Sequence, residues 1–132
     1  MRPTEAFNTD NDAESDAPLL DAAQLDGLIA VAGVDGTREI LGAFWRSSDS
    51  LIATLKDQLQ KAAAADAGRT AHALKGSALN VGAVRFSGSI RRIEECCRNL
   101  APSAALLLVS VAERQYRETV TAFEAHLKAG ER

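Results

Sequence analysis

The sequence predicts an all-α fold: an antiparallel up-and-down four-helix bundle with a short additional N-terminal helix. Apolar residues recur at spacings of three and four from about residue 21 onward, as on one face of a helix. Good helix formers abound, aromatic residues make up only 5%, and no segment shows the alternation of a strand. Because the breaks between periodic segments are short, consecutive helices are expected to be antiparallel neighbours.

The first two helices are predicted on either side of a glycine-containing break. Asp21, with Gln24 three residues later, resembles a capping box that opens a short helix through about Ala32. The segment Gly33–Gly36 interrupts it, and a long helix follows. The apolar stripe of that long helix consists of Leu41, Phe44, Ser48, Ile52, Leu55, Leu59 and Ala62.

Three further helices complete the predicted fold. Asp66 is expected to be the N-cap of a helix over 67–81, which ends at Gly82. Pro102 suits the first turn of the last helix. The helix between them carries an apolar stripe of Phe86, Ile90, Ile93, Cys97 and Leu100. The last helix is expected to bury Leu106, Val109, Tyr116, Val120, Phe123 and Leu127.

Length and composition favour one domain. The 132 residues are expected to form a bundle over residues 18–130, preceded by a flexible acidic tail, residues 1–17. A net charge of −3 argues against a general nucleic-acid binder. We find no signal peptide and no apolar run long enough to span a membrane, so we expect a cytoplasmic protein, with a monomer favoured. The adjacent Cys96 and Cys97 are expected to be reduced thiols, one buried and one near the surface.

The helix over 67–81 carries the residues of chemical interest. Its core face is predicted to contain Ala67, Ala71, Leu74, Ala78 and Val81. His72 lies more than a right angle from the centre of that face, so its imidazole should project into solvent. Lys75, Gly76 and Leu79 lie beside it on the same side of the helix.

These neighbours suit a phosphoryl acceptor. An unperturbed imidazole is largely neutral near pH 7 and has a lone pair that can attack phosphorus. Lys75 could stabilise the incoming negative charge, and Gly76 could leave room for a partner's backbone. Arg69 and Leu79 are candidate contacts for that partner. From the residues alone, an ordinary surface histidine beside a solvated lysine remains an open alternative.

A resemblance to a known family favours the phosphoryl acceptor. The stretch AHALKGSALNVGA, from Ala71 to Ala83, resembles the signature of the histidine-containing phosphotransfer (HPt) family, and the likeness covers about Asp21 to Leu127. The resemblance implies a four-helix bundle with His72 as phosphoacceptor, Lys75 as stabilising cation and Gly76 as the residue that gives access. It implies as partner a receiver domain of a response regulator or a hybrid histidine kinase. No cofactor is expected, because the Mg²⁺ for transfer should come with the receiver domain.

Missing motifs narrow the function further. The sequence shows no glycine-rich nucleotide loop and no strand–helix pattern with an acidic receiver site, so it predicts a phosphoryl carrier without kinase activity of its own. Nor do its two histidines and two cysteines have the spacing of a metal site. Two alternatives stay open: a receiver-binding scaffold or inhibitor bundle that is never phosphorylated, and a structural helical protein in which His72 is incidental.

Overall fold

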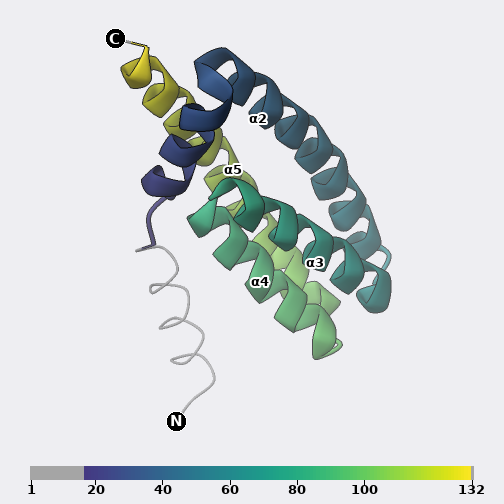
Figure 1. The fold of residues 1–132 in the computed structure, drawn as a ribbon. Helices are drawn as coiled ribbons and strands as arrows, with labels where there is room; N and C mark the ends of the chain where they lie inside the picture. Colours follow the sequence, from purple (N-terminus) through teal and green to yellow (C-terminus); the bar gives the residue numbers. More distant parts are fainter. Residues whose placement is uncertain (1–16, 132) are drawn as a thin grey trace.

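The computed structural model describes residues 17–131 and is all-helical over that range, as predicted (Figure 1). Its helices are α2 (Ala22–Gln60), α3 (Ala64–Val81), α4 (Val84–Arg98) and α5 (Pro102–Gly130), and no strand occurs among these residues. The predicted tail of residues 1–17 falls, apart from Ala17, outside the described residues. Within residues 17–131, no helix combines the length and the apolar character needed to cross a membrane.

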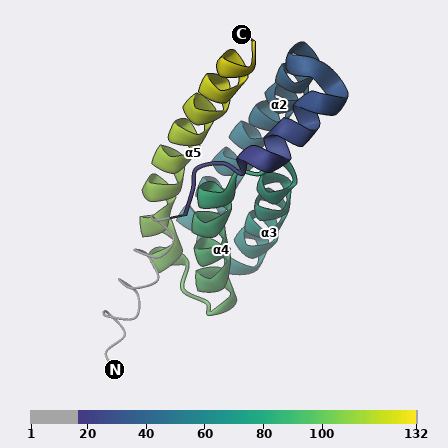
Figure 2. The ribbon, with the colours of Figure 1, turned by 60° about the vertical axis from the view of Figure 1, so that its left-hand side comes forward.

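Each helix packs against two others, so the four surround a common core (Figures 1 and 2). Helix α2 contacts α3 and α5, and α4 contacts the same two helices. Trp45 is partly buried and packs against this core, where its ring meets those of Tyr116 and Phe123 edge-on at centroid distances of 5.8 and 5.4 Å. The core also takes in Cys97, whereas Cys96 is only partly buried; both thiols are unpaired, and burial raises the pKa of each.

Helix α2 changes direction at Gly33, where the sequence predicts a break. Gly33 has φ 77° and ψ 170°, a conformation that glycine adopts without the steric cost of a side chain. The residues before Gly33 lie beside the C-terminal part of α5 (Figure 1). There Oδ1 of Asp26 lies 2.6 Å from Nε2 of His126, so the beginning of α2 is tied to α5.

The predicted capping box at Asp21 is only half formed. The backbone N–H of Gln24 donates to Oδ1 of Asp21 at 3.1 Å, which confirms Asp21 as the N-cap. The side chain of Gln24 does not return to Asp21 but donates to the carbonyl oxygens of Leu79 and Asn80, at 3.1 and 2.7 Å. Both carbonyls lie in the last turn of α3, where few backbone N–H groups remain to pair with them. The carbonyl of Leu79 also accepts a hydrogen bond from the backbone N–H of Gly82 at 3.2 Å. Gln24 therefore joins the start of α2 to the end of α3.

Helix α3 begins earlier than predicted. Its N-cap is Ala63, which makes no side-chain capping bond, so the expectation that Asp66 is the N-cap is wrong. Asp66 instead lies in the first turn, where its negative charge still suits the positive end of the helix. Helix α3 begins early because the connection from α2 is short. Ala62, with φ 57°, reverses the direction of the chain, and α3 starts two residues later at Ala64. The predicted end at Gly82, with φ 85°, is confirmed.

The end of α4 corrects the predicted apolar stripe. Phe86, Ile90, Ile93 and Cys97 are buried, but Leu100 is 79% exposed because α4 ends at Arg98. Leu100 has φ 56° and belongs to the turn that leads into α5. Pro102 is the first residue of α5, as predicted. Fewer of the residues predicted for the apolar faces of α2 and α5 are buried than expected. Ile52, Leu106 and Val120 are only partly buried, and Ala62 is exposed.

Candidate functional site

The core face of α3 determines where His72 points. Ala67, Ala71, Leu74 and Ala78 have no exposed surface, and their small side chains allow close packing of α3 against its neighbours. His72 lies on the opposite side of the helix, and its side chain is 71% exposed. The exposure predicted from the helical periodicity is therefore confirmed.

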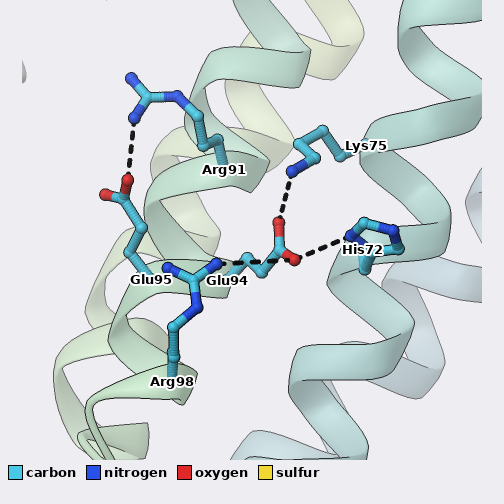
Figure 3. Close-up of polar contacts among 6 residues, drawn as sticks. All are labelled: His72, Lys75, Arg91, Glu94, Glu95 and Arg98. Atoms are coloured by element: carbon cyan, nitrogen blue, oxygen red, sulfur yellow. Dashed lines mark hydrogen bonds and ion pairs between the residues drawn. The ribbon is translucent and has the colours of Figure 1, made fainter.

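A glutamate of the neighbouring helix contacts His72. Oε2 of Glu94 lies 2.9 Å from Nδ1 of His72, and Oε1 of the same carboxylate accepts a hydrogen bond from Nζ of Lys75 at 2.7 Å (Figure 3). The sequence analysis missed Glu94. The only local signal was its place beside Ile93 on α4, near the edge of the apolar stripe, and that signal does not say which residue of α3 it meets.

The ionisation state of Glu94 follows from its surroundings. Its side chain is 12% exposed, and burial by itself raises the pKa of the carboxyl. The hydrogen bonds from Lys75 and His72 outweigh that effect, and the pKa of Glu94 lies below its ordinary value. Glu94 is therefore a carboxylate at neutral pH.

This charge identifies the protonated ring nitrogen of His72. An ionised carboxylate can only accept hydrogen bonds, so Nδ1 of His72 must be the donor. In the neutral ring the lone pair is then on Nε2. Figure 3 shows the second ring nitrogen on the side of the imidazole away from Glu94. The nucleophilic nitrogen thus faces outward.

Two cations, Lys75 and Arg98, lie beside the Glu94 carboxylate. Lys75 is only 23% exposed, and its ammonium is held against Glu94 of α4 rather than extended into solvent. A guanidinium nitrogen of Arg98 lies 3.8 Å from Oε2 of Glu94, and its side chain is 64% exposed. The neighbourhood of His72 is therefore rich in positive charge, which suits an incoming phosphoryl group.

A groove of about 300 Å³ adjoins His72 on the side of the N-terminus of α3. Arg69, predicted to contact a partner, lies on its wall, where its guanidinium is bonded to the carboxylate of Asp66. The groove is lined by Ala64, Ala65, Gly68, Arg69, His72, Glu94, Cys97 and Arg98. Three of these lining residues are alanine or glycine, so part of the groove wall beside the imidazole carries little side-chain bulk.

Gly76 and Leu79 lie on the other side of His72, toward the end of α3. A Cβ atom built on Gly76 would meet no atom within 4 Å, so no packing within the described residues requires a glycine there. Leu79, one turn further along, is 51% exposed. His72, Lys75, Gly76 and Leu79 thus follow one side of α3, as the spacing predicts.

With this geometry established, comparisons with known proteins identify the family. The Hpt domain model matches residues 39–127, more than half of the chain. The chain belongs to the Hpt domain family. This membership confirms the predicted class of function, histidine phosphotransfer in a phosphorelay. The segment of α2 before residue 39 lies outside the matched range.

Solved Hpt structures have the same fold. The crystal structure of histidine-containing phosphotransfer protein B (HptB) from Pseudomonas aeruginosa PAO1 superposes with a TM-score of 0.77 at 29% identity, over 86% of this chain and 97% of that one. A rice protein described as a histidine-containing phosphotransfer protein gives a TM-score of 0.73 at 19% identity, over 95% of this chain and 91% of that one. At that identity the rice protein supports the fold alone. A comparison with curated protein sequences gave no significant match.

Proposed function

We propose that His72 is the phosphoacceptor of this Hpt domain. The observation that carries the proposal is the exposed imidazole whose Nδ1–H is held by the Glu94 carboxylate, so that Nε2 presents its lone pair to solvent. In the proposed step, this lone pair forms a bond to the phosphorus of an aspartyl phosphate. The bond between phosphorus and the aspartate oxygen breaks, and the aspartate leaves as a carboxylate. The reverse sequence passes the group to the next aspartate.

The neighbouring residues support this step in different ways. Lys75, one turn from His72, is the proposed stabilising cation for the phosphoryl oxygens, because its ammonium is held close to the ring. Gly76 leaves the backbone bare beside His72, so that the partner's loops can approach closely. Leu79 offers apolar contact to the partner, and Arg69 offers a cation at the edge of the groove.

The proposed partner is a receiver domain, of a response regulator or of a hybrid histidine kinase. We expect its acidic pocket to supply the Mg²⁺, and this chain to act in the cytoplasm as a monomeric carrier without kinase activity of its own. The proposed module is residues 18–130, an antiparallel up-and-down bundle whose additional N-terminal helix is the segment before Gly33. The short connections at 61–63, 82–83 and 99–101 support this arrangement.

The test is transfer from a phosphorylated receiver domain to the full chain. We expect acid-labile, base-stable label on the wild-type chain and none on His72→Gln, with circular dichroism showing that the variant is folded. His126→Gln is the matched control, since His126 lies on α5 and contacts Asp26. Label that persists on His72→Gln would refute His72 as acceptor. Binding of the receiver without any label on the wild type would instead favour the unphosphorylated scaffold.

A further inference from the structure

We propose that Glu94 keeps the proton on Nδ1 of His72 throughout the phosphorylated state, so that the phosphoryl group arrives and leaves without any proton being gained or lost. The inference rests on the proposed phosphorylation of His72. It assigns to Glu94 a part in the transfer itself, in addition to orienting the unphosphorylated ring.

The chemistry of the ring gives this proton its importance. When Nε2 forms its bond to phosphorus, the ring keeps its proton on Nδ1 and becomes positively charged. In the onward step, the bond between Nε2 and phosphorus breaks and its electron pair returns to Nε2, which regenerates neutral imidazole. If Nδ1 had lost its proton, the group released would be an imidazolide anion, a far more basic and poorer leaving group. The proton on Nδ1 therefore keeps phosphohistidine competent as a donor.

The geometry shows what would hold that proton. Nδ1 of His72 lies 2.9 Å from Oε2 of Glu94, and the Glu94 side chain is only 12% exposed. A carboxylate in contact with the ring stabilises its positively charged form, and does so more strongly where solvent is partly excluded. Because Glu94 is already ionised in the resting protein, phosphorylation requires no change in its protonation.

The other charged groups around the ring act in the opposite sense. From α3, Lys75 shares the Glu94 carboxylate, and Arg69 lies on the wall of the groove in contact with Asp66. From α4, Arg98 lies 3.8 Å from the same carboxylate oxygen that meets Nδ1. These cations disfavour a positive ring while they favour the phosphoryl group. Among the described residues, Glu94 is the acidic group in direct contact with Nδ1. Its negative charge can therefore offset the effect of these cations on the ring.

The experiment measures the proton directly. The full chain, labelled with ¹⁵N-histidine, is phosphorylated with phosphoramidate, and long-range ¹H–¹⁵N spectra follow Nδ1 of phosphohistidine from mildly acidic to mildly alkaline pH. We expect Nδ1 of the wild type to keep its proton to a pH about one unit higher than in Glu94→Gln. Glu95→Gln, which removes a carboxylate 2.9 Å from Arg91, is the matched control and should follow the wild type.

Each outcome has a separate meaning. Equal deprotonation midpoints in the wild type and Glu94→Gln would overturn the inference. Failure to form phosphohistidine at position 72 in the wild type would overturn the proposed function itself. If Glu94→Gln does not fold, the wild type unfolded in urea replaces it as the reference, and the folded chain must still keep its proton to higher pH. As an independent readout, transfer to a receiver domain should fall with rising pH more steeply for Glu94→Gln than for the wild type.

Discussion

Nζ of Lys75 lies 2.7 Å from Oε1 of Glu94, and the two side chains are only 23% and 12% exposed. The other oxygen of the same carboxylate meets Nδ1 of His72. Lys75 and His72 are therefore connected through a residue of a different helix as well as through their own backbone. This shared carboxylate holds the ammonium beside the ring before any phosphoryl group arrives.

Replacing Lys75 with alanine should slow phosphoryl transfer while leaving the fold intact. We expect the transfer rate to fall about tenfold or more, because a cation near the phosphoryl oxygens is lost. The free energy of unfolding should change by less than about 1 kcal/mol, since Glu94 keeps its contact with His72 and the pair is not fully buried. Rapid-quench transfer assays and urea denaturation give the two quantities. Lys61→Ala, which removes an exposed ion pair with Asp57, should change neither quantity appreciably. A parallel loss of stability and transfer in Lys75→Ala would show a structural role.

Gly76→Ala should stabilise the protein and impair its function. The added methyl group meets no atom within 4 Å, and alanine favours a helix over glycine by about 0.5–1 kcal/mol. Transfer should nevertheless become slower, because the methyl group occupies space beside His72 that the partner needs. Urea denaturation and the transfer assay measure both effects. Gly27→Ala, at another open position on α2, should be stabilising without slowing transfer. An unchanged transfer rate in Gly76→Ala would show that the partner does not need the space beside His72 that a glycine leaves open.

Leu79→Ser should weaken binding to the cognate receiver domain. Leu79 is 51% exposed on the same side of α3 as His72, so its loss should cost apolar contact with the partner and little folding stability. Isothermal titration calorimetry with the receiver domain is the measurement. The control is Leu107→Ser, on α5, where the leucine is 78% exposed. Equal loss of affinity in the two variants would mean that the partner does not dock around Leu79.

The pair of Arg38 and Glu124 should make stability depend on pH. The hydrogen bond from Arg38 lowers the pKa of Glu124, with a distance of 2.8 Å between the guanidinium and the carboxylate. Because this pKa is lower in the folded than in the unfolded chain, the pair stabilises the fold above the ordinary pKa of glutamate. Its contribution is lost as the pH falls through the lower, folded value.

We therefore expect Glu124→Gln to weaken the pH dependence of stability. From about pH 5 to about pH 3, the wild type should lose more unfolding free energy than Glu124→Gln does. Urea denaturation at a series of pH values measures the difference. Glu118→Gln, which removes a longer, exposed pair with Arg114, should behave like the wild type. Identical pH profiles for the wild type and Glu124→Gln would contradict the prediction.

Local patterns in the sequence were sufficient for the helices and for the direction of His72. The predicted core face of α3 follows from the constant angle by which a helix advances per residue. Ala67, Ala71, Leu74 and Ala78 are buried, and the fifth residue of that face, Val81, is partly buried at the end of the helix. Gly82 and Pro102 mark helix boundaries through their own backbone preferences, and both boundaries are where the sequence places them.

Local patterns failed where the chain turns at a point that the periodicity does not reveal, or where a distant segment offers another hydrogen-bond partner. Asp66 has the side chain of an N-cap, but the sharp turn at Ala62 starts α3 before it. Leu100 continues the apolar spacing of α4, but the chain has already turned and the side chain is exposed. Gln24 has the spacing of a capping box, yet the carbonyls at the end of α3 lie within its reach and take its hydrogen bonds.

The sequence by itself determined that an exposed histidine stands on a helix beside a lysine and a glycine, since these neighbours are set by the rotation of one helix. Only the tertiary structure decided that Glu94 meets His72 and Lys75, because that contact depends on how α4 packs against α3. The packing also decides which ring nitrogen carries the proton. A carboxylate brought in from the neighbouring helix accepts the hydrogen of Nδ1 and leaves the lone pair on Nε2.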